Sequence, residues 1–217
     1  MPKYNGYKLS DQEITIDLTT EGQVLKYEVL NYSANIRVSI NKTGVQTATV
    51  GSNIMYNFRD IRNMSGVALD NFYWRDVLPT DVLRANYLTT GTYNTAKIYN
   101  VSVTTNLGRE FTIADNLSTT KDNYVDLRAA ALGLQSGEFV TSYKLNFGTV
   151  PSGFTQVTAP KLECYVLTGI QNGLYFVNKA DAGGQNNGQW TVANTTWGTT
   201  IYNPTPPVNP NYPKTGY

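Results

Sequence analysis

The chain of 217 residues contains no histidine and only one cysteine, Cys164. Without histidine, the chain lacks the side chain that most often serves as a general base or a metal ligand near neutral pH. A single cysteine excludes a disulfide framework within the chain. Because Cys164 lies in the strand-like run KLECYVL, we expect it to be a small buried hydrophobic residue. We therefore expect no metal site, no cofactor and no enzymatic activity.

Long apolar runs and an excess of one charge are also missing. No stretch of about 18 apolar residues occurs, so we expect no membrane span. The opening residues MPKYNGYKL contain no apolar core of a signal peptide. The formal net charge is +1, from 17 basic and 16 acidic residues, which gives no reason to expect binding to nucleic acid. We expect the chain to be a piece of a longer protein, because it begins inside one unit and ends inside a motif.

The residues that are abundant favour β structure, including 16 tyrosines and 18 glycines. Short alternating runs separated by turn signals predict an all-β fold, an immunoglobulin-like antiparallel β-sandwich. The predicted strands are residues 12–18, 24–32, 36–43, two strands within 54–80, and 96–104, 110–114, 139–147, 156–168, 174–180 and 189–203. One short helix is predicted over residues 123–134, with Asp126 as its cap and Gly137 after its end.

One carboxylate disturbs the alternation in the stretch 54–80. Tyr56, Phe58 and Asp60 share one parity, so the pattern aims Asp60 at the core with the two aromatic rings. An unpaired charge in a core is very costly, so Asp60 needs a partner. Lys42 is one candidate, because it shares the inward parity of the strand 36–43 with three apolar residues.

The first part of the chain resembles a known module. The segments NGYKLSD and GQVLKYEVLNYS are similar to the last hairpin of the collagen-adhesin B-type (Cna-B) modules of pilins and wall-anchored proteins in Gram-positive bacteria. In that family an asparagine of the final strand often forms an amide crosslink to a lysine of the first strand. Asn31 matches that asparagine, and the first strand is absent here. Residues 1–34 are therefore expected to be the end of a truncated module.

A second resemblance covers residues 36–82. The sequence INKTG…TVGSNIMYNF…NMSGVALDNFYWRDVLPTD is similar to bacterial surface-repeat domains, which are β-sandwiches in fibrillar cell-surface proteins. Farther along, FVNKADAGG resembles the penultimate strand of such domains. The resemblance implies one sandwich domain over residues 35–203.

The tail, residues 204–217, begins with a proline-rich stretch that suits an extended polyproline II linker. The next five residues, Tyr212, Pro213, Lys214, Thr215 and Gly216, resemble the sortase sorting motif Leu-Pro-x-Thr-Gly, with tyrosine in place of leucine. The resemblance implies that a sortase cleaves between Thr215 and Gly216 and joins Thr215 to peptidoglycan or to a neighbouring pilin subunit. It also implies a secreted protein of the cell wall. The alternative is a chance match in an extended tail.

A crosslink within the sandwich is the main chemical hypothesis. Asn203 shares its parity with apolar residues of the last strand, and the first and last strands of a sandwich are often neighbours. Lys42, Asp60 and Asn203 would then meet as the lysine, acid and asparagine of an intramolecular isopeptide bond, with Asn178 as the alternative acceptor. The simpler interpretation is a Lys42–Asp60 ion pair at the rim, or a parity that is wrong by one residue.

The expected function is that of a structural stalk of a wall-attached pilin or fibrillar adhesin. One alternative is an adhesin domain for a host protein or glycan, in which three tryptophans could form a sugar-stacking platform, although a role in the core is favoured. The other is a glycosidase, for which three glutamates are scattered without supporting spacing. The tryptophans are Trp74, Trp190 and Trp197, and the glutamates are Glu110, Glu138 and Glu163.

Overall fold

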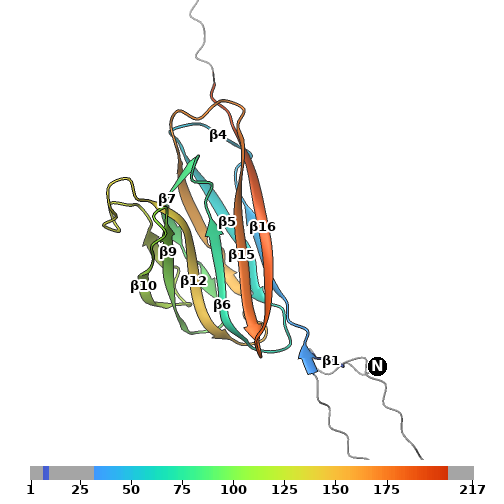
Figure 1. Cartoon of the computed structure of the whole chain (residues 1–217). Coiled ribbons are helices and arrows are strands. Elements are labelled where there is room, and N and C mark those ends of the chain that lie inside the picture. Colours follow the sequence, from blue (N-terminus) through green and yellow to red (C-terminus); the bar gives the residue numbers. More distant parts are fainter. Residues whose placement is uncertain (1–6, 10–31, 205–217) are drawn as a thin grey trace, which may run out of the picture.

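Alternating apolar and polar residues build two stacked β-sheets in the computed structural model, which describes residues 7–9 and 32–204 (Figure 1). No helix occurs among these described residues, so the predicted all-β sandwich is confirmed. The strands are β1 (Tyr7–Leu9), β2 (Tyr32–Ala34), β3 (Val38–Thr43), β4 (Thr47–Ala48), β5 (Asn53–Asn63), β6 (Leu69–Val77), β7 (Leu83–Thr89), β8 (Thr92–Tyr93), β9 (Ile98–Thr105), β10 (Glu110–Ser118), β11 (Tyr124–Asp126), β12 (Val140–Val150), β13 (Gln156–Thr158), β14 (Lys161–Val166), β15 (Tyr175–Asn186) and β16 (Gln189–Ile201).

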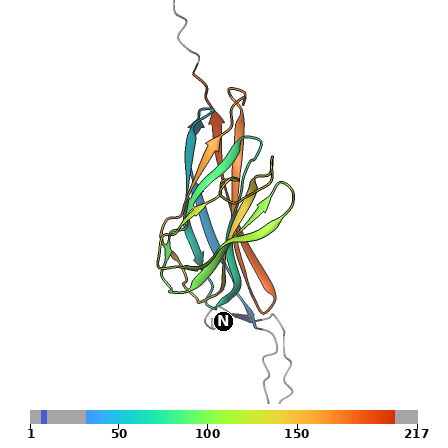
Figure 2. The same ribbon diagram turned by 90° about the vertical axis from the view of Figure 1, so that its left-hand side faces the viewer.

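The larger sheet has the strand order β10-β9-β12-β6-β15-β16-β4, and the smaller has the order β11-β7-β14-β5-β3. Within these sheets every pairing is antiparallel except that of β16 with β4. Two short pairs, β1 with β2 and β13 with β8, lie outside both sheets. Figures 1 and 2 show that β3 starts at one end of the sandwich and that β16 finishes at the opposite end.

Aromatic side chains from both sheets fill the space between the layers. The Phe58 ring of the smaller sheet lies 4.8 Å from the Trp74 ring of the larger sheet, centre to centre. Trp74 is fully buried, and its indole N–H donates a 2.8 Å hydrogen bond to the Tyr93 hydroxyl. The core therefore contains a large aromatic side chain whose polar atom is satisfied, as burial requires.

The predicted helix over residues 123–134 is wrong. Residues 124–126 form β11, which pairs with β7, and turns follow. The Asp126 carboxylate accepts the Arg128 backbone N–H at 3.0 Å, so the predicted cap residue closes a local turn and no helix follows. Gly133 has a φ of 61°, in the left-handed region that interrupts helical geometry. Pairing with a distant strand overrides the helix propensity of the alanines.

Several strand boundaries also differ from the prediction, two of them for clear local reasons. The segment 156–168 is divided into β13 and β14 around Pro160, which has no N–H for a strand ladder. The strand predicted over 174–180 continues through the glycines of DAGG as β15, and the turn falls at Asn187 and Gly188.

The proposed division of the chain into residues 1–34, 35–203 and 204–217 stays a prediction. Most of the first unit, including Asn31, and the sorting motif at 212–216 lie outside the described residues.

A β-bulge changes the direction of Asp60. Along β5, Tyr56 and Phe58 are buried, and burial resumes at Ile61 rather than at Asp60. Asp60 has a φ of 55°, and the register between β3 and β5 shifts there by one residue. The extra residue reverses the alternation, so Asp60 faces solvent and pairs with Arg62 at 3.0 Å. The prediction that Asp60 points into the core is wrong for this reason.

Candidate crosslink site

Lys42 is the buried cation of the sandwich core. It lies near the end of β3 on the inward parity that the sequence predicts, and only 2% of its surface is exposed. Its ammonium nitrogen lies 4.5 Å from the centre of the Tyr56 ring and 5.0 Å from that of Phe58. Two aromatic rings therefore exclude water from this amine on the β5 side.

Asp76 supplies the carboxylate that Lys42 contacts. It lies on β6 with Phe72 and Trp74 on the inward parity, and it is fully buried. The Lys42 amine forms a hydrogen bond and ion pair with Asp76 Oδ1 across the space between the two sheets. A buried ion pair from which water is excluded is weak evidence for stability, but such pairs with shifted pKa values are frequent at functional sites.

Asn178 completes the cluster from the neighbouring strand, β15. Its backbone position is two residues before Ala180, which is paired with Asp76 across the ladder, so the two side chains are diagonal neighbours on the inner face. The Asn178 side-chain nitrogen lies 3.2 Å from Asp76 Oδ2. Asn178 is fully buried, and its Oδ1 has no hydrogen-bond partner among the described residues.

The unpartnered amide oxygen of Asn178 has a simple geometric meaning. The two ends of a side-chain amide have nearly the same shape, so a half-turn about its terminal torsion exchanges oxygen and nitrogen. After that exchange Oδ1 would lie at the Asp76 carboxyl group. A protonated Asp76 could then donate a hydrogen bond to Oδ1 and polarise the amide carbon.

Burial shifts the acid and the amine toward their neutral forms. Burial lowers the pKa of Lys42, and the nearby Asp76 charge only partly opposes this shift. Burial likewise raises the pKa of Asp76, against the opposite influence of Lys42. Both directions favour transfer of the shared proton from the amine to the carboxylate, since a dry site disfavours charges. Both shifts bring an uncharged lysine amine beside a carboxylic acid within easier reach of the pair.

Asn203, the predicted acceptor, lies elsewhere. It follows the end of β16, where its Oδ1 accepts the Val50 backbone N–H at 3.2 Å and its Nδ2 donates to the Ile170 carbonyl at 3.3 Å. These bonds fasten the end of the last strand to two loops. The structure thus brings Lys42 and the alternative acceptor Asn178 to the same carboxyl group, that of Asp76, whereas the side chains of Asp60 and Asn203 have other partners.

Three glutamates considered for glycoside hydrolysis occupy unrelated places. Glu110 is exposed, 4.0 Å from Lys144, whereas Glu163 accepts hydrogen bonds from two asparagine side chains. Glu138 pairs with Arg109, whose hydrogen bonds lower the pKa of Glu138 to about 2. A general acid needs a raised pKa, so Glu138 is unsuited to that role.

Among the tryptophans, Trp74 lies in the core as favoured by the sequence, Trp197 is partly buried at the core's edge, and Trp190 is 53% exposed. Cys164 is buried, as expected. The described residues contain no group of three or more His, Cys, Asp or Glu side chains that could hold a metal ion. Within the same part of the chain, no helix is long and apolar enough to cross a membrane.

Comparison with known proteins gives structural similarities only. No family model and no curated protein sequence matches the chain. Solved structures that it resembles include the C-terminal domain of the AgI/II polypeptide BspA from Streptococcus agalactiae, with 14% identity, a TM-score of 0.40, and coverage of 75% of this chain and 50% of that one. The chain thus spans half of the BspA structure.

Two further structures show similar arrangements. The collagen-binding domain of a Staphylococcus aureus adhesin has 16% identity and a TM-score of 0.32, with 77% of this chain and 99% of that chain covered. The Enterococcus faecalis MSCRAMM ACE, which binds its ligands by the collagen hug model, has 12% identity and a TM-score of 0.30, with 76% of this chain and 50% of that chain covered.

Asp76 is the residue that sequence reasoning missed, although its signal is present. Phe72, Trp74 and Asp76 repeat the alternation of Tyr56, Phe58 and Asp60, two aromatic residues followed by an acid on the same parity. The first of these acids turns outward at a bulge, and the second stays inward.

Proposed function

We propose that this chain is a load-bearing stalk domain of a bacterial surface protein, locked by an isopeptide bond between Lys42 and Asn178. The single observation that supports it best is the buried contact of one carboxyl group, Asp76, with both an amine and an amide. A core rarely keeps such polar groups without a use, because their burial is costly.

The reaction is a condensation that releases ammonia. The neutral Lys42 amine attacks the Asn178 side-chain carbonyl carbon, while protonated Asp76 donates to the carbonyl oxygen and stabilises its developing charge. Asp76 then takes a proton from the attacking nitrogen and passes one to the departing amide nitrogen. The C–N bond to ammonia breaks, the new C–N bond to Lys42 remains, and Asp76 ends protonated as it began.

The new bond would join β3 of one sheet to β15 of the other and close a loop of about 136 residues. By analogy with a disulfide, closing such a loop stabilises the fold by roughly 5 kcal/mol through loss of chain entropy in the unfolded state. A covalent tie between the two layers suits a domain that transmits tension.

The pentapeptide that resembles a sorting motif supports a further part of this proposal, that the chain is attached to the cell wall. Tyr212, Pro213, Lys214, Thr215 and Gly216 follow a proline-rich stretch, and an extended peptide of this kind fits a protease-like groove. A sortase would transfer Thr215 to peptidoglycan or to another pilin subunit. The protein would then be secreted and attached to the cell wall, and its role would be structural rather than enzymatic.

Intact-mass measurement of the purified full chain tests the bond. The expected mass is lower than the sequence mass by one ammonia, and tryptic digestion should yield a branched peptide that joins the Lys42 and Asn178 segments. A chain at its full sequence mass under denaturing conditions would remove the crosslink from the proposal. Attachment to the cell wall has its own test: sortase should no longer join a Thr215→Ala chain to an amine.

A further inference from the structure

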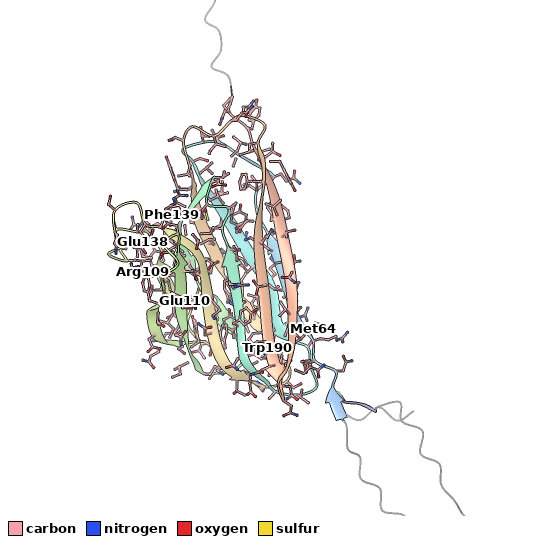
Figure 3. All side chains as sticks on the ribbon, viewed as in Figure 1. Met64, Arg109, Glu110, Glu138, Phe139 and Trp190 are labelled. Carbon is pink, nitrogen blue, oxygen red and sulfur yellow. The ribbon has the colours of Figure 1, made fainter. Side chains whose placement is uncertain are left out.

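A cavity of about 490 Å³ lies beside β7 and β14 of the smaller sheet and is also lined by residues 127–129 and 137–140. Lys42 lies on β3, the edge strand of the same sheet. Its volume falls in the range of small-molecule binding sites. Figure 3 places Glu138 and Phe139 on this flank of the sandwich. The side chains that decide its chemistry are Arg84, Asn86, Arg128, Glu138, Phe139 and Tyr165.

Arg84 gives the cavity a fixed positive charge. Its guanidinium carbon lies 3.7 Å from the centre of the Phe139 ring. One nitrogen, Nη1, donates to the backbone carbonyl oxygens of Thr80 and, at 2.9 Å, of Leu83. The other two nitrogens, Nε and Nη2, make no hydrogen bond within the described part of the chain. Partial burial also lowers the pKa of Arg84, which means that an anion beside it would relieve a desolvation cost.

Two carboxylates near the cavity are already neutralised, and a third, the exposed Asp81, acts on the charge of Arg84 without forming an ion pair with it. Both oxygens of Glu138 are bound by Arg109, at 2.7 and 2.8 Å. Arg128 likewise donates three side-chain hydrogen bonds to the two carboxylate oxygens of Asp126. Arg84 has no ion-pair partner among the described residues. The balance of charge among the residues that line the cavity is therefore positive, and a planar carboxylate matches the open edge of the Arg84 fork.

Flat aromatic surfaces continue from the cavity toward solvent. Arg128 lies over the Tyr87 ring at 4.6 Å, and the Tyr87 and Tyr124 rings are 5.0 Å apart, centre to centre. Tyr124 is 62% exposed. The Asn86 side chain donates to Glu163 and Asn53, which leaves its own oxygen as an acceptor for a hydroxyl group. Stacking faces and hydroxyl-binding amides are features that suit a sugar ring.

We infer that this cavity binds an acidic saccharide. The sugar carboxylate pairs with Nε and Nη2 of Arg84, its ring packs on Phe139 and Tyr165, and a ring hydroxyl donates to Asn86. An acidic peptide is the less suitable occupant, because it would need a row of cations and the cavity offers a single unpaired one, Arg84. This inference is independent of the crosslink, since no residue that lines the cavity is hydrogen-bonded or ion-paired to Lys42, Asp76 or Asn178.

Titration of the full chain with sodium glucuronate and, separately, with glucose tests the inference by calorimetry or NMR. Glucuronate should bind at least about tenfold more tightly than glucose, since a hydrogen bond to a charged group is typically worth more than the energy of one factor of ten. Its affinity should fall as salt is added. Arg84→Gln should weaken glucuronate binding about tenfold or more, and the matched control Arg59→Gln, an exposed arginine on β5, should leave it within about twofold.

Three results would overturn the site. The first is equal affinity for glucuronate and glucose, and the second is unchanged glucuronate binding in Arg84→Gln. The third is binding of sodium acetate, which carries the charge without a ring, as tightly as glucuronate. Should Arg84→Gln fail to fold, as judged by thermal unfolding, Phe139→Leu takes its place. Loss of glucuronate binding in Phe139→Leu would support the site, and retention would exclude it.

Discussion

The Asn178 side-chain nitrogen lies 3.2 Å from one oxygen of Asp76, and the Lys42 amine contacts the other oxygen of the same carboxyl group. One acid therefore touches both partners of the proposed bond at once. The three residues come from β3, β6 and β15, so the folded sandwich has to form before they can meet. Crosslinking should follow folding rather than assist it.

Asp76→Asn should abolish the crosslink. The amide has nearly the shape of the acid but cannot transfer a proton to the leaving nitrogen. We expect the variant to fold and to show the full sequence mass. The matched control is Asp60→Asn, at the exposed acid of the β5 bulge, which should keep the ammonia deficit. A deficit that persists in Asp76→Asn would mean that the acid is not required.

Substituting the two candidate acceptors separates them. Asn178→Ala should give the full mass, and Asn203→Ala should keep the deficit, because Asn203 only fastens loops at the end of β16. Without the tie, the free energy of unfolding should fall by about 5 kcal/mol. In a domain of this size that corresponds to roughly 10–20 °C in melting temperature, measurable by calorimetry. The opposite pattern of masses would restore Asn203 as the acceptor.

The ion pair of Glu138 and Arg109 should make stability depend on acid pH. The pKa of Glu138 is about 2 in the folded chain, against a usual value of 4.5. A depressed pKa stabilises the fold above the unfolded value, and this stability is lost as pH falls from about 4.5 toward 2. Glu138→Gln should therefore be less stable than the parent at pH 7, and the difference should shrink by pH 2. Chemical denaturation at several pH values measures it, and a constant difference would contradict the prediction.

Cys164 should report on opening of the core. It is fully buried, and burial raises the pKa of its thiol well above the usual value, so the reactive thiolate is scarce. Iodoacetamide should leave Cys164 unmodified in the folded chain and should label it in denaturant. In Asn178→Ala, labelling should begin at a lower denaturant concentration than in the parent. Rapid labelling of the native chain would show that the core opens without unfolding.

Much of the fold was accessible from the sequence, because alternation marks half-buried strands wherever it is regular. The inward position of Lys42 is such a case. Asp60 and Asp76 show the limit of that reasoning. Each follows two aromatic residues on one parity, and only the bulge at Asp60 distinguishes them. A bulge depends on the register with a neighbouring strand, which alternation alone cannot supply.

The segment 123–134 shows a second limit. Its alanines favour a helix locally, yet residues 124–126 gain more by extending the sheet at β7. The packing of β3 against the paired strands β6 and β15 of the other sheet was equally hidden, because alternation says nothing of strand order or of which strands face one another. Asn178 could thus be named as a candidate acceptor, and only the sheet order brings it to Asp76.

The chain enters the sandwich through β3 at one end and leaves it through β16 at the other, and this arrangement has a mechanical consequence (Figure 1). With Lys42 joined to Asn178, a pull on the two ends bypasses residues 43–177, which cannot lengthen. The force would then cross from β15 to β16 along the strand axis and load the paired positions from Asn178 to Asn186 together. Such a shear resists rupture as a whole, so the final hairpin, together with the part of β3 that precedes Lys42, would carry the tension and set the force at which the sandwich yields.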